Sequence, residues 1–205
     1  MQGQNGKSNR GRLQRTIYFC KKIDNFNFII ALICFVYYMD ISLDITMDKY
    51  IVSLEGIFDE HKVCRSHGIA HAVCVLKNAF KALEYYDISE HDKFLVQLAA
   101  LLHDADDKKF FPKNTNYQNL RKVMNGFPES DIELVIYMVQ LVSSSVNGDS
   151  IPDRVTNQLW MLIPRYADRL EAIGIIGIER CYQYTKTSNA SLFCSDTPFP
   201  ETEAE

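Results

Sequence analysis

The spacing of apolar residues from residue 47 onward constrains the fold of this chain most strongly. In residues 47–61, MDKYIVSLEGIFDEH, apolar side chains recur three and four positions apart, and the same spacing continues through residues 67–86, HGIAHAVCVLKNAFKALEYY. Residues spaced in this way lie on one side of an α-helix, where they can be buried together. No stretch of useful length alternates apolar and polar residues as a half-buried strand would. The pattern predicts an all-α domain.

Three further helices are expected before residue 146. They are residues 93–104, 117–126 and 130–145. Short polar residues favour helix starts because their side chains accept hydrogen bonds from free backbone N–H groups. Asp92 is therefore expected to cap the first of these helices, and Ser130 or Asp131 the third. Gly126 suits the end of the second, because glycine readily adopts the backbone conformation that terminates a helix.

The segment 154–184 is long enough for two helices. Proline interrupts a helix and glycine allows a sharp turn, so we expect a kink near Pro164 or a joint near Gly174. The body of the fold is expected to span residues 47–190, with 191–205 as a frayed tail. A length of 205 residues fits one such domain with extra material at its ends.

Residues 1–46 form a basic and then apolar extension. Residues 1–23 hold six Lys or Arg and no acid, and residues 26–39, FNFIIALICFVYYM, are apolar apart from Asn27. This order resembles a signal peptide or signal anchor, although the apolar run is shorter than the roughly 20 residues that cross a bilayer. An anchoring segment, a helix packed on the main domain and an unfolded extension all remain open. We expect a cytoplasmic location, with membrane association through residues 26–39 as the alternative.

Charge and cysteine content exclude some classes of function. The formal net charge of −4 gives no basic surface for non-specific nucleic-acid binding, so no nucleic-acid partner is expected. None of the six cysteines forms a CxxC pair, which argues against a zinc ribbon or a dithiol redox site. Free thiols in a reducing compartment are therefore expected. The sequence gives no prediction of the oligomeric state.

Histidines and aspartates at helical positions suggest a metal site. His67 and His71 are four residues apart and share a helix face, His103 and Asp104 end the apolar segment LAALLHD, and Asp168 lies in the apolar segment YADRLEAIG. A carboxylate within an apolar helix is unfavourable unless something balances its charge, and a divalent cation is one such balance. Imidazole and carboxylate ligands together suit a transition metal better than calcium.

The segments SHGIAHAVCVLKNA, LLHDADDKK and ADRLEAIGIIGIER resemble, in this order, the HD-domain phosphohydrolase superfamily and its branch of small stand-alone hydrolases. The resemblance covers roughly residues 50–190 and implies an HD-domain helical bundle. It also implies that His71, His103, Asp104 and Asp168 bind one divalent transition metal, which can be Mn, Co, Fe, Ni or Zn. The residues LVSSSVNG, 141–148, resemble a Ser-rich turn of the same branch.

The chain departs from the pattern of the superfamily in three places. Gly68 stands where many relatives carry a second acid, so no ligand is expected there. No histidine lies between Asp104 and Asp168, which predicts one metal and argues against the cyclic-dinucleotide and two-iron oxygenase branches. Relatives continue through another helix or two after the Thr-Pro pair near residue 197, which leaves open whether a chain that ends at 205 keeps a complete pocket and its activity.

Several polar residues near these motifs are candidates for catalysis. Asp104 adjoins the metal and can also act as the base, whereas Asp107 either orients a water or belongs to a turn. Lys108 is expected to act on a phosphate, the alternative being a solvated loop; the same alternatives hold for Lys109.

Four residues are candidates for contact with substrate. His67 is expected to lie next to the metal ligands or to face a phosphate, against a structural or exposed role. Lys108 and Arg169 are expected to bind phosphate oxygens. Arg180 is a weaker candidate, because it can pair instead with Glu171 or with Glu179.

The expected function is metal-dependent hydrolysis of a phosphate ester or phosphoanhydride in a small molecule, with a nucleotide as the first candidate substrate. One ion can polarise a phosphoryl oxygen and lower the pKa of a bound water. A cyclic-nucleotide phosphodiesterase is the enzymatic alternative. The alternative from another class is a catalytically inactive HD fold that binds a nucleotide or a partner.

Overall fold

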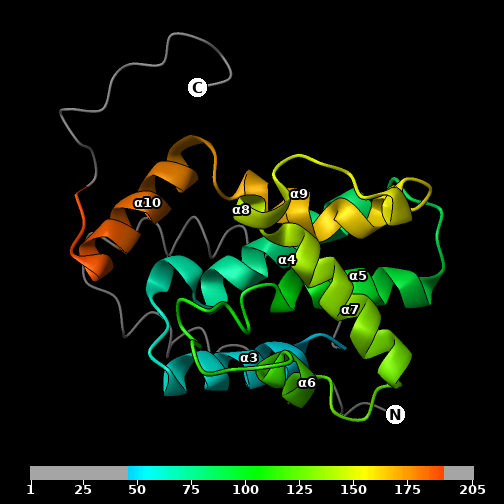
Figure 1. Cartoon of the computed structure of the whole chain (residues 1–205), viewed down its shortest axis with the longest axis horizontal. Coiled ribbons are helices and arrows are strands. Elements are labelled where there is room, and N and C mark those ends of the chain that lie inside the picture. The colour runs from blue at the N-terminus through cyan, green and yellow to red at the C-terminus, as the bar shows by residue number, and fades with distance from the viewer. Residues whose placement is uncertain (1–45, 192–205) are drawn as a thin grey trace, which may run out of the picture. The chain divides into compact units, whose positions relative to one another are not determined.

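The computed structural model describes residues 46–191, and the part of the chain that it describes is all-α, without a β-strand (Figure 1). This confirms the predicted fold class. The helices belong to the unit Asp48–Glu205. The predictions for the N-terminal extension and the C-terminal tail fall, apart from Thr46 and Ser191, outside the described residues.

The first two helices follow the predicted apolar pattern. Helix α3 spans Asp48–Glu60. It buries the apolar residues that recur at helical spacing, together with Tyr50: Ile51, Leu54, Ile57 and Phe58. Helix α4 spans Ile69–Leu83, two residues shorter at its start than the sequence pattern indicated. A 3-10 turn at Arg65–His67 precedes it, and Gly68 is its N-cap. His67 therefore lies just before α4 and His71 in its first turn.

Helix α5, Glu90–Leu102, is mostly buried from Leu95 onward, because its apolar residues face neighbours on several sides. Its N-cap is Ser89, so the prediction that Asp92 caps it was wrong. The Ser89 hydroxyl accepts a hydrogen bond from the Asp92 backbone N–H at 3.0 Å and donates to its carboxylate at 2.6 Å. Serine followed three residues later by an acid is close to a capping box, in which the first residue is the cap.

Helices α6 (Gln118–Val123), α7 (Glu129–Val142) and α8 (Ser144–Asn147) follow. The carboxylate of Asp106 accepts the backbone N–H groups of Asn119 at 3.1 Å and Leu120 at 2.9 Å, and so caps α6 from a distant loop. Helix α7 begins directly after Pro128, which places Ser130 and Asp131 inside the helix rather than at its cap.

The segment 154–184 is divided as expected, with the joint at Gly174. Residues Leu159–Leu162 form a 3-10 turn, and α9 (Ile163–Leu170) and α10 (Gly174–Ser188) follow. Pro164 lies in the first turn of α9, where its missing N–H is harmless, so it starts a helix instead of kinking one. Gly174 has a φ of 62°, which glycine adopts without strain.

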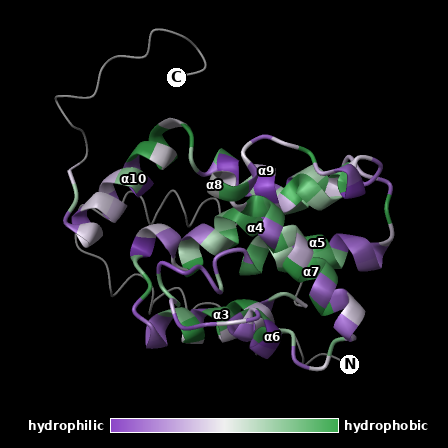
Figure 2. Cartoon of the chain, viewed as in Figure 1, coloured by the Kyte–Doolittle hydropathy of each residue, from purple (hydrophilic) through white to green (hydrophobic). Residues whose placement is uncertain are grey.

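Helices α4 and α5 pack against each other at the centre of the described unit, with α3 and α6 along one side and α9 along the other (Figure 1). Helix α5 also packs against α7, and α7 packs against α9. The first turns of α5 and α7 are hydrophilic and the following turns hydrophobic, which is the pattern of helices whose starts reach solvent (Figure 2). The first turn of α4, the end of α5 and helix α9 are thereby brought together.

A fully buried arginine joins α9 to the end of α7. Arg165 Nε donates a hydrogen bond to the carbonyl of Leu141 at 2.7 Å, and its Nη1 donates to the carbonyl of Ser150 at 2.8 Å. The first of these carbonyls belongs to the last turn of α7, where helix carbonyls have no partner within the helix. Arg165 therefore positions the helix that carries Asp168.

Helix α10 packs against the fold through few contacts and buries none of its own residues. It contacts the 3-10 turn Arg65–His67. Its Ile175, Ile178 and Tyr182 recur at helical spacing and are exposed, the first by 79% of its surface. Within residues 46–191, no helix has both the length and the apolar character needed to cross a bilayer.

Candidate metal centre

The motif His103-Asp104 lies where α5 ends, as the sequence suggested. His103 is the C-cap residue of α5, and its ring is buried. The His103 Nδ1–H donates a hydrogen bond to the carbonyl of Ala100 at 2.9 Å. A carbonyl oxygen only accepts, so the hydrogen on Nδ1 is fixed and the Nε2 atom is the one that faces the centre. Metal-binding histidines are oriented in the same way.

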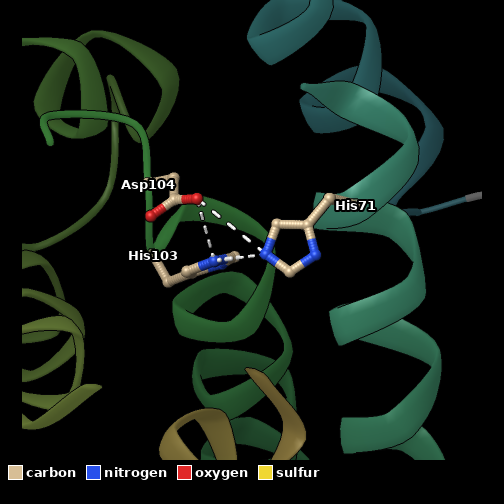
Figure 3. A group of neighbouring side chains, drawn as sticks. All are labelled: His71, His103 and Asp104. Carbon is tan, nitrogen blue, oxygen red and sulfur yellow. Dashed lines mark hydrogen bonds and ion pairs between the residues drawn. The ribbon is translucent and has the colours of Figure 1, made fainter. Parts of the chain in front are cut away.

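His71 approaches this pair from the first turn of α4. Its Nε2 atom lies 3.1 Å from His103 Nε2 and 3.9 Å from Asp104 Oδ2, while His103 Nε2 lies 3.3 Å from the same oxygen. Figure 3 shows the three side chains directed at one another from two helices. One ligand atom from each lies within 4.8 Å of the others, as a shared ion requires.

Asp168 completes the group from α9. Its Oδ1 atom lies 3.1 Å from His71 Nε2 and 3.7 Å from His103 Nε2. The four side chains that the sequence analysis proposed as ligands are therefore neighbours in space, although nearly a hundred positions separate the first from the last. That they bind a metal stays a prediction.

The donor atoms fit a cation. Two imidazole nitrogens and two carboxylate oxygens face the same small space, and all four carry lone pairs. The buried Asp104 Oδ2 atom makes no hydrogen bond of good geometry with the described residues, and its contacts are the ion pairs with His103 at 3.3 Å and His71 at 3.9 Å. Buried polar atoms normally have a hydrogen-bond partner, so a carboxylate oxygen without one at this position is the kind of exception that a bound ion explains. Two nitrogens and two oxygens suit a transition metal.

The same crowding perturbs the pKa values of the side chains. Burial lowers the pKa of His71 to about 4. Burial also acts to lower the pKa of His103, but the adjacent Asp104 and Asp168 outweigh it and raise that pKa to about 9. Burial acts to raise the pKa of Asp104, and the two histidines outweigh it and hold that pKa well below its usual range. In the metal-free protein a proton on His103 therefore supplies the positive charge between the two carboxylates.

Arg180 is the arginine that reaches this cluster. Its Nη2 atom donates to His71 Nε2 at 3.0 Å, and its Nη1 lies 4.0 Å from Asp168 Oδ1. The rest of the guanidinium is held by two backbone carbonyls, since Nε donates to Ser66 at 3.0 Å and Nη1 to Glu171 at 3.1 Å. From sequence, Arg169 was the favoured candidate for contact with substrate and Arg180 the weaker one.

Arg169 lies elsewhere in the described structure. Its guanidinium binds the carboxylate of Asp149 and the carbonyl of Gly148, in the turn after α8. None of its described contacts is with the four candidate ligands. The prediction that Arg169 binds substrate stays a prediction, and these contacts give it no support.

His67 lies beside the cluster and is itself closely held. Its Nδ1 atom is 3.0 Å from Ser66 Oγ and 3.3 Å from Cys64 Sγ. Its ring packs against Phe110, Tyr184 and the His71 ring, whose centroid is 6.4 Å away. Burial lowers the pKa of His67, and the nearby Asp104 opposes that effect. The structure thus brings His67 next to the candidate ligands, and its contacts also fit the structural alternative, so a role toward substrate stays a prediction.

The charged residues Asp107, Lys108 and Lys109 differ in whether their contacts lead toward the candidate ligands. Lys108 is exposed, and its ammonium group donates to the carbonyl of Asn114. Asp107 accepts the Lys109 backbone N–H at 2.8 Å, a turn contact, and its carboxylate lies 3.9 Å from the Lys109 ammonium. Lys109 in turn lies over the Tyr184 ring and lowers the pKa of His67, so it is the lysine with described contacts toward the cluster.

Three features in or near the centre were missed or undervalued from sequence. Arg180 is far along the chain from every candidate ligand except Asp168, and nothing local shows that α10 turns it back toward α4. Asp106, inside HDADDKK, looked like one more loop charge, yet it caps α6. Glu171 is buried and accepts a hydrogen bond from Asn78 at 3.0 Å, which ties α4 to the end of α9.

Comparison with known proteins shows a relationship to a viral protein. No family model matches the chain. The chain is 36% identical, over 168 residues, to "Uncharacterized protein L803" of Acanthamoeba polyphaga mimivirus, and the match covers 75% of this chain and 67% of the relative. The name of that relative states no activity. With this identity over two thirds of the relative's length, the chain belongs to the same protein family as L803 of Acanthamoeba polyphaga mimivirus.

Proposed function

We propose that this protein is a metal-dependent phosphohydrolase of the HD type, acting on a small phosphorylated molecule. The observation that carries the proposal is the approach of four side chains, His71, His103, Asp104 and Asp168, to one small buried space from three separate helices. The order and neighbours of these residues in the sequence resemble the HD superfamily, which supports the same reaction class.

One divalent transition metal per chain is the proposed cofactor, with Mn, Co, Fe, Ni and Zn as candidates. His71 and His103 would bind it through Nε2, and Asp104 and Asp168 through one carboxylate oxygen each. When bound, such an ion polarises a phosphoryl oxygen and lowers the pKa of a water molecule in the site. No extra histidine lies between Asp104 and Asp168 to support a second ion.

The remaining roles belong to side chains of the protein. Asp104 has a second carboxylate oxygen that can accept a proton from the attacking water, and the two histidines keep it ionised. His67 is proposed to contact the substrate, because Ser66 and Cys64 occupy its Nδ1 and leave Nε2 for another partner. Asp107 and Lys108 remain candidates for catalysis that their described contacts do not strengthen.

A nucleotide is the proposed substrate class. The rings of Phe110 and Tyr184 both pack against the His67 ring, with centroids 5.2 and 5.4 Å from its own. Aromatic side chains of this kind offer surfaces on which a base can stack, and the phosphate of the same molecule would then lie toward the metal ligands. A cyclic nucleotide would use the same features. The experiment below therefore includes cyclic nucleotides, and their products would reveal a phosphodiesterase reaction.

The test uses the full chain with Mn²⁺ or Co²⁺ and a panel of linear and cyclic nucleotides, with products separated by chromatography. The matched variants are Asp168→Asn, which removes a proposed ligand, and Asp153→Asn, which changes an exposed aspartate in a 3-10 turn. We expect release of monophosphate or phosphate from the wild type and Asp153→Asn and none from Asp168→Asn. A folded, metal-loaded wild type that binds a nucleotide without turnover would support the binding protein instead and refute the enzyme.

A further inference from the structure

The guanidinium of Arg180 is held at three points of different character. Two are backbone carbonyls, those of Ser66 and Glu171, which accept from Nε and Nη1. The third is the Nε2 atom of His71, which accepts from Nη2 at 3.0 Å. The two carbonyls are backbone groups and are not among the proposed metal ligands. The His71 nitrogen is one of the four proposed ligand atoms.

His71 Nε2 cannot serve both partners. When a neutral His71 carries its hydrogen on Nδ1, as metal binding through Nε2 requires, Nε2 has a single lone pair. A guanidinium is always a donor, so in this tautomer the Arg180 contact at 3.0 Å uses that lone pair, toward which His103 Nε2 at 3.1 Å also lies. A metal ion would need the same lone pair. Binding of an ion through His71 therefore breaks the hydrogen bond to Arg180 Nη2, while the two carbonyls keep the guanidinium in place.

The released guanidinium group would then require a new partner. It remains beside Asp168, which lies 4.0 Å from Nη1, but that carboxylate is also a proposed ligand. A guanidinium and a divalent cation that border the same two ligands repel each other. An anionic oxygen between them removes the repulsion and satisfies the free donor, and phosphoryl oxygens match the donor geometry of arginine well.

We infer that Arg180 is the substrate-binding arginine and that it becomes available to a phosphoryl group only when the metal is bound. The inference rests on the proposed function for the metal centre and adds to it an order of binding, metal before phosphate. It also replaces Arg169, the arginine that adjoins a proposed ligand in sequence, by one that contacts two of them in space.

The test measures two affinities by calorimetry, that of Mn²⁺ for the full-length metal-free protein and that of inorganic phosphate for the Mn²⁺-loaded protein. Arg180→Met removes the charge, Arg180→Lys keeps it without the planar donor group, and Arg154→Met is the matched control at an exposed arginine that stacks on the Tyr137 ring. We expect Arg180→Met to weaken phosphate binding by about tenfold to a hundredfold, the range for loss of a charge-assisted hydrogen bond. Arg180→Lys should fall between it and the wild type, and Arg154→Met should match the wild type.

The Mn²⁺ affinity separates this role from a structural one. Arg180→Met removes a competitor for His71 Nε2 and a positive charge beside the ion, so its Mn²⁺ affinity should equal or exceed that of the wild type. A variant that merely loosened α10 would lose affinity for both ligands. The metal-free wild type should bind phosphate at least tenfold more weakly than the loaded protein, within the same range.

Three results would overturn the inference. They are phosphate binding that is unchanged in Arg180→Met, phosphate binding that does not depend on Mn²⁺, and loss of Mn²⁺ affinity in Arg180→Met. The first two leave the metal centre and the hydrolase proposal standing if turnover is seen. Conversely, metal-dependent phosphate binding through Arg180 in a protein without turnover would retain the inference and refute the hydrolase. Absence of any Mn²⁺ binding would overturn both.

Discussion

Replacement of Arg165 by methionine should destabilise the protein and weaken its metal centre together. Arg165 is the largest fully buried side chain of the described fold, and its two hydrogen bonds join α9 to the end of α7. Methionine fills a similar volume without polar atoms, so the substitution removes the bonds and the charge while leaving little empty space. The expected effect depends on which of these losses is larger.

The magnitude follows from the surroundings of the two carbonyls. Ser150 is exposed and water can replace Arg165 there, whereas Leu141 is buried and its carbonyl would be left without a partner. An unsatisfied buried acceptor costs about 1–3 kcal/mol. Removal of the buried charge acts in the opposite direction, because Arg165 Nη2 has no partner among the described residues. Since two of the three guanidinium nitrogens are well bonded, we expect a net loss of about 1–3 kcal/mol.

The assay is a thermal melt followed by circular dichroism, with and without Mn²⁺. A loss of that size lowers the melting temperature by about 2–12 °C for a chain of this length. Because α9 carries Asp168, the increase in melting temperature on adding Mn²⁺ should also be smaller than in the wild type. Arg154→Met is the control, since Arg154 is exposed and stacks on the Tyr137 ring at 4.1 Å. An unchanged or higher melting temperature for Arg165→Met would refute the view that its carbonyl contacts outweigh its buried charge.

Three further predictions concern metal, pH and a helix cap. Mn²⁺ at a hundred times its Kd should stabilise the wild type by about 2.7 kcal/mol, with reversal by a chelator and little effect on Asp168→Asn; equal stabilisation of both would contradict the ligand assignment. The pKa of His103 is raised to about 9 in the metal-free fold, so its contribution to stability is complete below its ordinary pKa of 6.5 and lost as the pH rises through 9. Melting temperatures of the metal-free protein should therefore fall between pH 7 and about 9.5, and those of the Mn²⁺-loaded protein should not, because a bound ligand carries no proton. Ser89→Ala should cost about 1 kcal/mol in urea unfolding by removing the cap of α5, whereas an effect no larger than that of Asp153→Asn would contradict the capping role.

The helices could be predicted because they depend on the local spacing of apolar residues. Apolar residues at helical intervals identified the buried faces of α3 and α4 directly. The set of four candidate ligands, which includes His71 in α4 and Asp168 in α9, came instead from the resemblance to the HD superfamily. What the spacing alone does not supply is the direction from which other elements approach, and the two arginines illustrate this.

Arg169 was favoured because it follows Asp168 in the chain, but adjacent residues of an α-helix point about 100° apart. If Asp168 faces the centre, Arg169 cannot, and it binds the turn at Asp149 instead. Arg180 reaches the centre from α10, the helix that begins after the joint at Gly174. Likewise, the capping of α6 by Asp106 joins residues that are 13 and 14 positions apart, which no helical pattern indicates.

The contrast between α5 and α10 has a consequence for local unfolding. Helix α5 is buried along most of its length, so its amide hydrogens should exchange with solvent only on global unfolding. Helix α10 has no buried residue and is held through the 3-10 turn and Arg180, so it should open at a much smaller free energy and exchange far sooner. His103 and Asp104 thus lie at the end of a well-protected helix, while the arginine that completes the cluster belongs to a weakly protected one. The centre has a rigid half that fixes the geometry of its ligands and a half that can detach and return without unfolding the rest.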